Sequence, residues 1–279
     1  ALSSSHDQHA DRIPLLPTLQ VESIMPHLII ERLRAFPSFF TTGWPERKSS
    51  RFFTYLIEVL DIVAAVIFIG GSICFLPSYA LHLPIFYFGC SLYIVGSIVY
   101  CVICLFTFGE ALSSKGSYAY EVWENGLYLA GSVLFLVGSV LYIPPEEHVR
   151  AIHIIVSLGQ VCDSFDYPQR QLVGTVLFIV GSVLFVLAAF TNLLSQQKAD
   201  AWSARMLSAV TTCYMGGSLL FALGSVAFLP HLGCGEEMMA LGAWCFIVGS
   251  ALFLAGSMLS MWRTVAVLGS TEVAGLLTR

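Results

Sequence analysis

The chain has 279 residues, of which 57% are hydrophobic and only 11% are charged, and its formal net charge at pH 7 is −5. This composition is much more apolar than that of a soluble globular domain and is typical of a chain embedded in lipid. Nothing in the charge pattern indicates nucleic-acid binding, so we expect no nucleic-acid partner.

Residues 1–50 form an N-terminal arm that precedes the first apolar segment. Prolines at positions 14, 17, 26 and 37 prevent a long helix from running through it. Within the arm, segment 27–36 is helix-like, with the pattern of a short helix lying on a membrane surface, against a partner or on the protein's own loops. The arm has too few apolar residues to fold alone, so order in it would indicate a partner.

The start of the chain is Ser-rich, with mixed charges and no apolar signal core after Ala1. Such a start is typical of a mature protein that has lost a targeting segment, although an artificial start would look the same. If the lost segment is a transit peptide, we expect a mitochondrial inner membrane or a thylakoid membrane.

Six apolar segments follow the arm, and each is long enough to cross a bilayer as a helix of roughly 20 residues. These segments are residues 54–76, 85–108, 123–143, 171–194, 207–229 and 238–262. They are continuous apolar runs, not alternating strands of about ten residues, which excludes a transmembrane β-barrel. The sequence therefore predicts an all-α integral membrane protein with six transmembrane helices.

The distribution of Lys and Arg predicts the orientation of these helices. Of the 13 basic residues, only Arg150 and Arg170 fall on the side of loops 78–84, 144–170 and 230–237. By the positive-inside rule, both termini face the cytoplasm or, in an organelle, the matrix or stroma.

Every predicted span carries the motif aromatic-x-x-Gly-Ser near its middle. In chain order, the aromatic residue and the glycine are Phe68 and Gly71, Tyr93 and Gly96, Phe135 and Gly138, Phe178 and Gly181, Phe221 and Gly224, and Phe246 and Gly249. A further small residue precedes each of these glycines by seven positions, so each helix has a stripe of small residues two turns long. Repetition on this scale indicates that one structural unit occurs several times.

Odd and even spans differ in a regular way, which defines the unit as a helical hairpin. Spans one, three and five end in proline six residues after the glycine, at Pro77, Pro144 and Pro230, whereas the even spans continue. The predicted organisation is the arm 1–50, hairpins 51–110, 118–196 and 205–263, the long loop 144–170 inside the second hairpin, and a C-terminal tail 264–279.

This hairpin, with Phe-x-x-Gly-Ser in the odd helix and Gly-x-x-x-Phe-x-x-Gly-Ser in the even one, resembles the YrhK-like family of small membrane domains. The resemblance covers residues 54–262 three times over. It implies the hairpin fold, and it brings no chemistry that can be assigned to particular residues.

The central glycines are the first candidate functional positions, as helix-packing residues. Little hydrophobic force acts between helices in lipid, so their association depends on close packing, which small residues allow. The six positions are Gly71, Gly96, Gly138, Gly181, Gly224 and Gly249. The alternative is that the glycines and serines line a polar pathway, which their uniform occurrence in all six spans does not favour.

Asp61 is the deepest acidic residue in the predicted spans, with Glu58 and Glu124 nearer the ends. An acid inside a span marks a pathway by default, because it costs at least ~2.5 kcal/mol near the bilayer centre. We expect Asp61 to pair with Arg51 or with a polar partner on another helix, and the alternative is a proton or cation site.

No metal, cofactor or catalytic site is predicted. All seven histidines lie outside the spans, without the His and Cys spacing of a zinc site and without an axial ligand for haem or chlorophyll. Cys101 and Cys104 form a C-x-x-C inside an apolar helix, where we expect small buried side chains. Cys162 and Cys234 lie outside the spans, on the side away from the positive charges, and could form a disulfide.

These observations predict a non-catalytic structural or accessory subunit of a larger membrane complex. Its partners would be lipids and other integral membrane proteins, contacted through the Gly-Ser stripes and the arm. The alternative is a small-solute or proton transporter with Asp61 in its pathway. A transporter should have a polar cavity at mid-membrane that reaches Asp61, whereas a structural subunit should have a dry, glycine-tight interior and an ordered arm.

Overall fold

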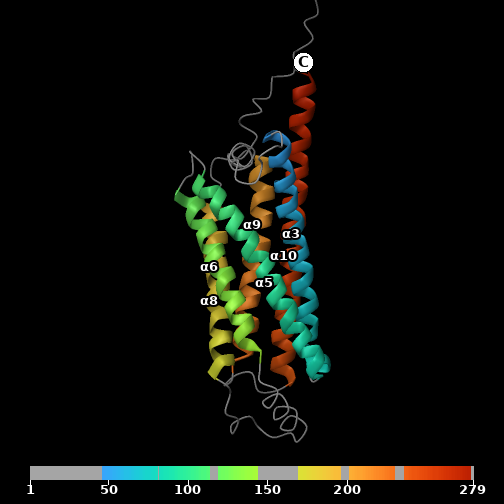
Figure 1. Cartoon of the computed structure of the whole chain (residues 1–279), viewed down its shortest axis with the longest axis vertical. Coiled ribbons are helices and arrows are strands. Elements are labelled where there is room, and N and C mark those ends of the chain that lie inside the picture. The colour runs from blue at the N-terminus through green and yellow to red at the C-terminus, as the bar shows by residue number, and fades with distance from the viewer. Residues whose placement is uncertain are drawn as a thin grey trace, which may run out of the picture.

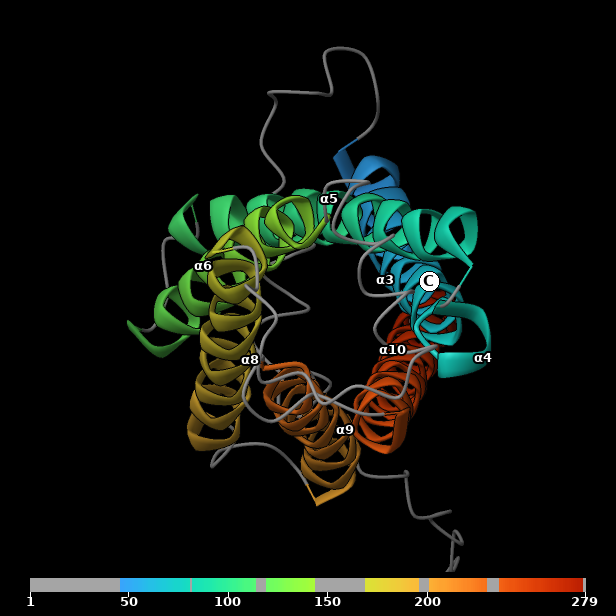
Figure 2. The same ribbon diagram turned by 90° about the horizontal axis from the view of Figure 1, so that it is seen from below.

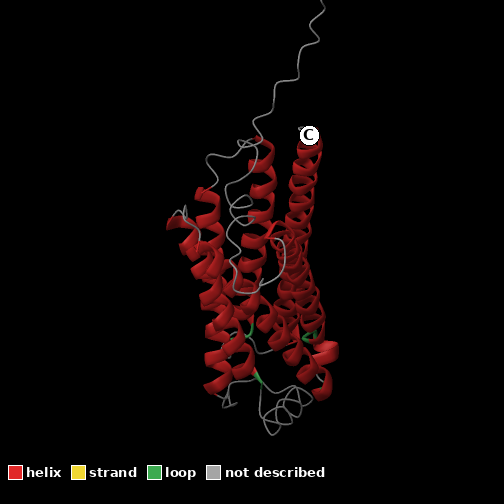
Figure 3. Cartoon of the chain, turned by 45° about the horizontal axis from the view of Figure 1, so that its top comes forward, coloured by secondary structure: helices red, strands yellow, loops and turns green. Residues whose placement is uncertain are grey.

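The computed structural model describes residues 46–80, 82–113, 119–143, 169–195, 201–229 and 236–277, and these parts of the chain are almost entirely helical (Figures 1 and 3). The long helices are α3 (Glu46–Cys74), α5 (Leu83–Ser113), α6 (Ala119–Tyr142), α8 (Gln169–Ser195), α9 (Ala201–Ala227) and α10 (Glu236–Leu277), and α4 (Pro77–Ala80) is a single turn. The predicted disulfide between Cys162 and Cys234, the long loop and nearly all of the arm lie outside the described residues.

All six long helices are long and apolar enough to cross a membrane. The predicted architecture of six spans in an all-α integral membrane protein is therefore confirmed. Helix α10 is longer than its predicted span and continues to Leu277, through the segment expected as a tail. That segment contains no proline, so nothing in its backbone stops the helix.

The odd helices α3 and α9 end in the same way. Their last turns tighten, with Phe75 N–H donating to Ser72 O at 3.1 Å in α3 and Phe228 N–H donating to Ser225 O at 3.1 Å in α9. Bonds of this i to i+3 type satisfy carbonyls that an α-helix leaves unpaired at its end. In α3 the chain then meets Pro77, which starts α4 at the position where proline is tolerated.

The six long helices form a closed ring. Each helix packs on the next one in the chain, and α10 packs on α3, so the last repeat closes on the first. Figure 2 shows this ring along its axis. Because the helices alternate in direction, α3 begins and α10 ends at the same end of the bundle, which is called the terminal end below (Figure 1).

The outside and the inside of the ring carry different residues. Valine and leucine side chains such as Val63, Val137 and Leu223 are exposed on the outside, as expected where a helix faces lipid. The motif aromatics and serines are buried. The membrane-facing surface is therefore apolar, and the repeated motif points away from it.

Candidate functional site inside the helical ring

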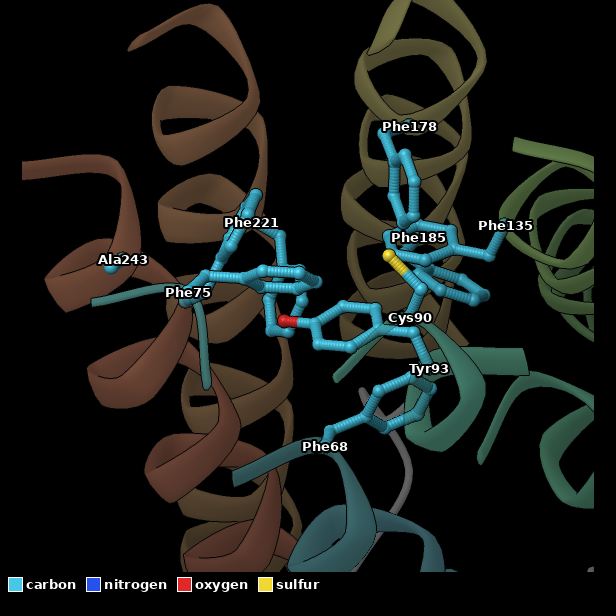
Figure 4. Packing of buried hydrophobic residues seen from close by; sticks show 10 residues of the cluster. Phe68, Phe75, Cys90, Tyr93, Phe135, Phe178, Phe185, Phe221 and Ala243 are labelled. Carbon is cyan, nitrogen blue, oxygen red and sulfur yellow. The ribbon is translucent and has the colours of Figure 1, made fainter. Parts of the chain in front are cut away.

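The six motif aromatics meet in one cluster at the centre of the ring, which we call the central layer: Phe68, Tyr93, Phe135, Phe178, Phe221 and Phe246. Figure 4 shows most of these rings side by side. Within each hairpin the two rings lie 5.0–5.2 Å apart between centroids, and rings from different hairpins also touch, as Phe135 and Phe221 do at 5.8 Å. These separations are typical of favourable aromatic pairs. The layer therefore ties all three hairpins together.

Each ring of the central layer lies over the motif glycine of the other helix in its hairpin. A Cβ added to Gly71 would lie 2.6 Å from Tyr93, and one added to Gly96 would lie 3.1 Å from Phe68. The same reciprocal relation holds for Phe135 with Gly181 at 2.8 Å and for Phe246 with Gly224 at 2.8 Å. Glycine is needed here because any side chain would occupy the volume of the aromatic ring.

The glycines also bring backbones into close approach. A Cβ on Gly138 would lie 3.0 Å from the carbonyl oxygen of Gly174, and one on Gly174 would lie 3.0 Å from that of Gly138. Gly217 and Gly249 face each other in the same way, at 2.9 and 3.0 Å. The glycine-bearing faces are thus occupied by contacts within the hairpins.

Most motif serines donate a hydrogen bond within their own helix. Ser139, Ser182 and Ser225 donate to the carbonyl four residues earlier at 2.7–2.8 Å, which is a common arrangement for a serine inside a helix. Ser72 makes the same bond and also lies 2.8 Å from the hydroxyl of Tyr93. Ser97 differs, because its hydroxyl oxygen is buried and has no hydrogen-bond partner among the described residues.

Asp61 lies on α3, ten residues before Gly71 and so about 15 Å from it along the helix, toward the terminal end. Its Oδ2 accepts hydrogen bonds from the hydroxyls of Tyr214 at 2.5 Å and Ser257 at 2.7 Å. The donors come from α9 and α10. The expected partner of Asp61 is therefore a pair of hydroxyls on other helices, while the side chain of Arg51 lies outside the described residues.

Glu58, one turn before Asp61, is buried in the contact that closes the ring. Its Oε1 accepts hydrogen bonds from Ser260 at 3.0 Å and Thr264 at 3.1 Å, both on α10. The two acids of α3 thus join the first repeat to the last one.

A second polar group lies at the terminal end, between α6, α8 and α9. Asn192 donates to Oε1 of the buried Glu124, and Thr211 donates to the side-chain oxygen of Asn192 at 3.3 Å. This chain links the second hairpin to the third, as the acids of α3 link the third to the first.

Two small cavities lie inside the ring, one on each side of the central layer. The larger one, of about 30 Å³, lies toward the terminal end and is bordered by Asp61, Ser97 and Tyr100 together with several phenylalanine rings. The smaller one, of about 20 Å³, is lined by residues of the opposite half, including Phe75, Tyr142 and Thr175. About 10–15 Å³ suffices for one water molecule, so each cavity has room for one or two molecules of that size.

The interior combines features of both functional expectations. A cavity does border Asp61, but its exposed wall is almost entirely apolar, whereas a transporter was expected to have a polar one, and the interior around the central layer is glycine-tight. Among the described residues no group of His, Cys, Asp and Glu could hold a metal ion. Cys104 lies 3.2 Å from Ser132, and both Cys101 and Cys104 are buried free thiols.

Sequence reasoning singled out Asp61 but missed Tyr214 and Ser257, the two residues that donate hydrogen bonds to it. The repeat holds a signal for one of them. Counting ten residues back from the glycine of each odd helix gives Asp61, Tyr128 and Tyr214, so one register position faces the same region in all three hairpins.

The YrhK-like protein family matches residues 118–197 and 205–265, which are the second and third hairpins and make up about half of the chain. Neither the curated proteins nor the solved structures include a match to this chain. The first hairpin, outside the matched segments, has the same motif and the same reciprocal glycine contacts. The chain belongs to the YrhK-like family.

Proposed function

We propose that this protein is a non-catalytic structural or accessory subunit of a larger membrane-protein complex. The observation that carries the proposal is the closed ring with an interior filled by interlocked aromatic rings. Rings seated on backbone at close range leave little room for one hairpin to slide past another. Such a bundle is suited to a rigid role among other membrane proteins and lipids.

The surfaces for partners follow from the same contacts. The glycine faces are engaged inside the hairpins, so we propose that partners meet the exposed outer faces of the helices and the N-terminal arm. Exposed tryptophans such as Trp123 and Trp262, near the terminal end, suit the level of the lipid headgroups. We further propose an organelle inner membrane or thylakoid as the location, with the termini on the matrix or stromal side.

The test of the subunit role is purification of the tagged full-length protein from its native membrane in a mild detergent. We expect a complex larger than the chain, and loss of the partner when residues 1–45 are deleted. The helical bundle itself should survive this deletion, which size-exclusion chromatography and circular dichroism would show. If the full-length protein purifies only alone, the proposal is wrong.

The second candidate function is a small-solute or proton transporter, which is favoured by the cavity at Asp61. Its test is flux into liposomes that contain the purified protein. A transporter should lose flux in Asp61→Asn and keep it in Glu237→Gln, which removes one exposed acid from the start of α10. A structural subunit should show no flux, and its assembly should tolerate Asp61→Asn because an amide preserves size and most of the hydrogen bonding.

A further inference from the structure

The walls of both cavities are built from aromatic residues at two registers of the repeat. Besides the aromatic residue three positions before the motif glycine, every span carries a second one four positions after it. In chain order these second aromatics are Phe75, Tyr100, Tyr142, Phe185, Phe228 and Phe253. Each of them lines one of the two cavities.

The two registers combine in a regular way around each cavity. The larger cavity is lined by one ring from each of the six long helices: Phe68, Phe135 and Phe221 from the odd helices, and Tyr100, Phe185 and Phe253 from the even ones (several of them in Figure 4). The smaller cavity is lined by the other six rings of these two registers. Because all three hairpins supply the same registers, the cavities are a product of the repeat and not isolated packing defects.

The larger cavity offers almost no polar surface to a ligand. Asp61 and Ser97 border it, but its exposed wall is almost entirely apolar, and Oδ2 of Asp61 is engaged by Tyr214 and Ser257. A buried water molecule needs about two to four polar partners, and an ion would lose its hydration here without compensation. The wall therefore disfavours water and ions and admits an apolar molecule.

An apolar molecule gains contacts in such a cavity. The atoms that line an empty space lose dispersion contacts on one side, and an occupant of matching size restores them. The volume of about 30 Å³ has room for one or two molecules of the size of water, which suits a diatomic molecule. Apolar gases also favour hydrocarbon over water, so lipid around the bundle would supply them.

We propose that the larger cavity binds one small apolar gas molecule of the size of dioxygen, held by contact with the six aromatic rings. The cage excludes ligands that need hydrogen bonds because its wall offers them no partner. The site does not depend on the proposed subunit function, since the contacts lie inside a single chain.

The direct test uses the paramagnetism of dioxygen, which accelerates the relaxation of methyl protons close to it. The purified full-length protein, with isotope-labelled alanine methyl groups, is compared by NMR in detergent under dioxygen and under dinitrogen at equal pressure. We expect a several-fold larger acceleration at Ala65, which lines the cavity, than at Ala188 and Ala243, which are fully buried and line neither cavity. Equal acceleration at the three methyl groups overturns the proposal. Transfer of magnetisation from water to the Ala65 methyl group also overturns it, because water would then fill the cavity.

Filling the cavity gives a second readout through the same methyl group. Ser97→Val adds apolar volume at the wall and should reduce the acceleration at Ala65 to the level at Ala188. Ser91→Val, the matched change at an exposed serine on α5, should leave the acceleration unchanged. An unchanged acceleration in Ser97→Val with the elution profile of the wild type contradicts the proposal. If Ser97→Val does not fold, the comparison of Ala65 with Ala188 in the wild type still decides.

Discussion

The central layer and the polar group around Asp61 lie on the same helices but are built on opposite principles. The central layer uses the same two residue types at the same register in all six helices. The Asp61 group uses a register at which the repeats differ, with an acid on α3 where α6 and α9 have tyrosine. The repeated positions therefore build the ring, whereas a position at which the repeats differ places an acidic side chain at the border of a cavity.

The largest effect is expected from a large side chain in the central layer. In Gly181→Leu, the new Cβ would lie 2.8 Å from Phe135 and 3.1 Å from the Gly131 carbonyl oxygen, and the rest of the leucine has no space. We expect a cost above the about 1–3 kcal/mol typical of overpacking, and hence loss of folded protein. The yield of monodisperse protein in detergent measures this effect.

The control for this substitution is Gly109→Leu. A Cβ on Gly109 would meet nothing within 4 Å, so this variant should be obtained in normal yield. Equal yields for both variants would mean that the central layer can open without cost.

A smaller effect is expected from alanine substitutions at two adjacent glycines on α9, one of which serves as the control for the other. Alanine at Gly217 would place Cβ 2.9 Å from the Gly249 carbonyl oxygen, whereas alanine at Gly216 would meet only Leu252, at 3.4 Å. We expect Gly217→Ala to destabilise the protein by about 1–3 kcal/mol. Gly216→Ala should be neutral or stabilising by up to about 1 kcal/mol, because alanine favours the helix. Unfolding by added SDS measures both, and a reversed order would refute the role of backbone approach.

A weaker effect on stability is expected when the tyrosines that α6 and α9 carry at the register position of Asp61 are replaced by phenylalanine. Tyr214→Phe removes the hydroxyl that donates to Asp61, which should cost about 0.5–1.5 kcal/mol. Tyr128→Phe changes the equivalent tyrosine of α6, whose hydroxyl makes no hydrogen bond to any described residue, and should change stability by less. The temperature of unfolding in detergent compares the two, and similar shifts would show that the bond to Asp61 adds no stability.

The smallest effect is expected at Ser97. Because its hydroxyl has no partner, Ser97→Ala should leave the temperature of unfolding unchanged or raise it slightly. Ser72→Ala, which removes a bond to Tyr93, should lower that temperature. A lower temperature for Ser97→Ala than for Ser72→Ala would mean that Ser97 is satisfied in the folded protein.

The sequence alone determined the number of spans and the unit of repetition. Runs of about 20 apolar residues can cross a bilayer only as helices, and the regular prolines after spans one, three and five divide these helices into pairs. The motif also predicts close packing at Gly71 and its five counterparts. Glycine destabilises the interior of a helix, so its regular occurrence there indicates that another group approaches the backbone closely. The family resemblance followed from the same repeated positions.

Only the tertiary structure decided which surfaces the repeated residues contact and at which position a repeated residue lacks the bond that its counterparts make. Periodicity does not say whether a small-residue stripe meets its own hairpin or a partner protein, and the structure places it inside the hairpin. The contact of α10 with α3 joins residues about 200 positions apart, as in the bond from Ser257 to Asp61, so no local sequence pattern could predict it. Ser97 belongs to the same motif as its counterparts, and only the packing of the helices around it leaves its buried hydroxyl without a hydrogen bond.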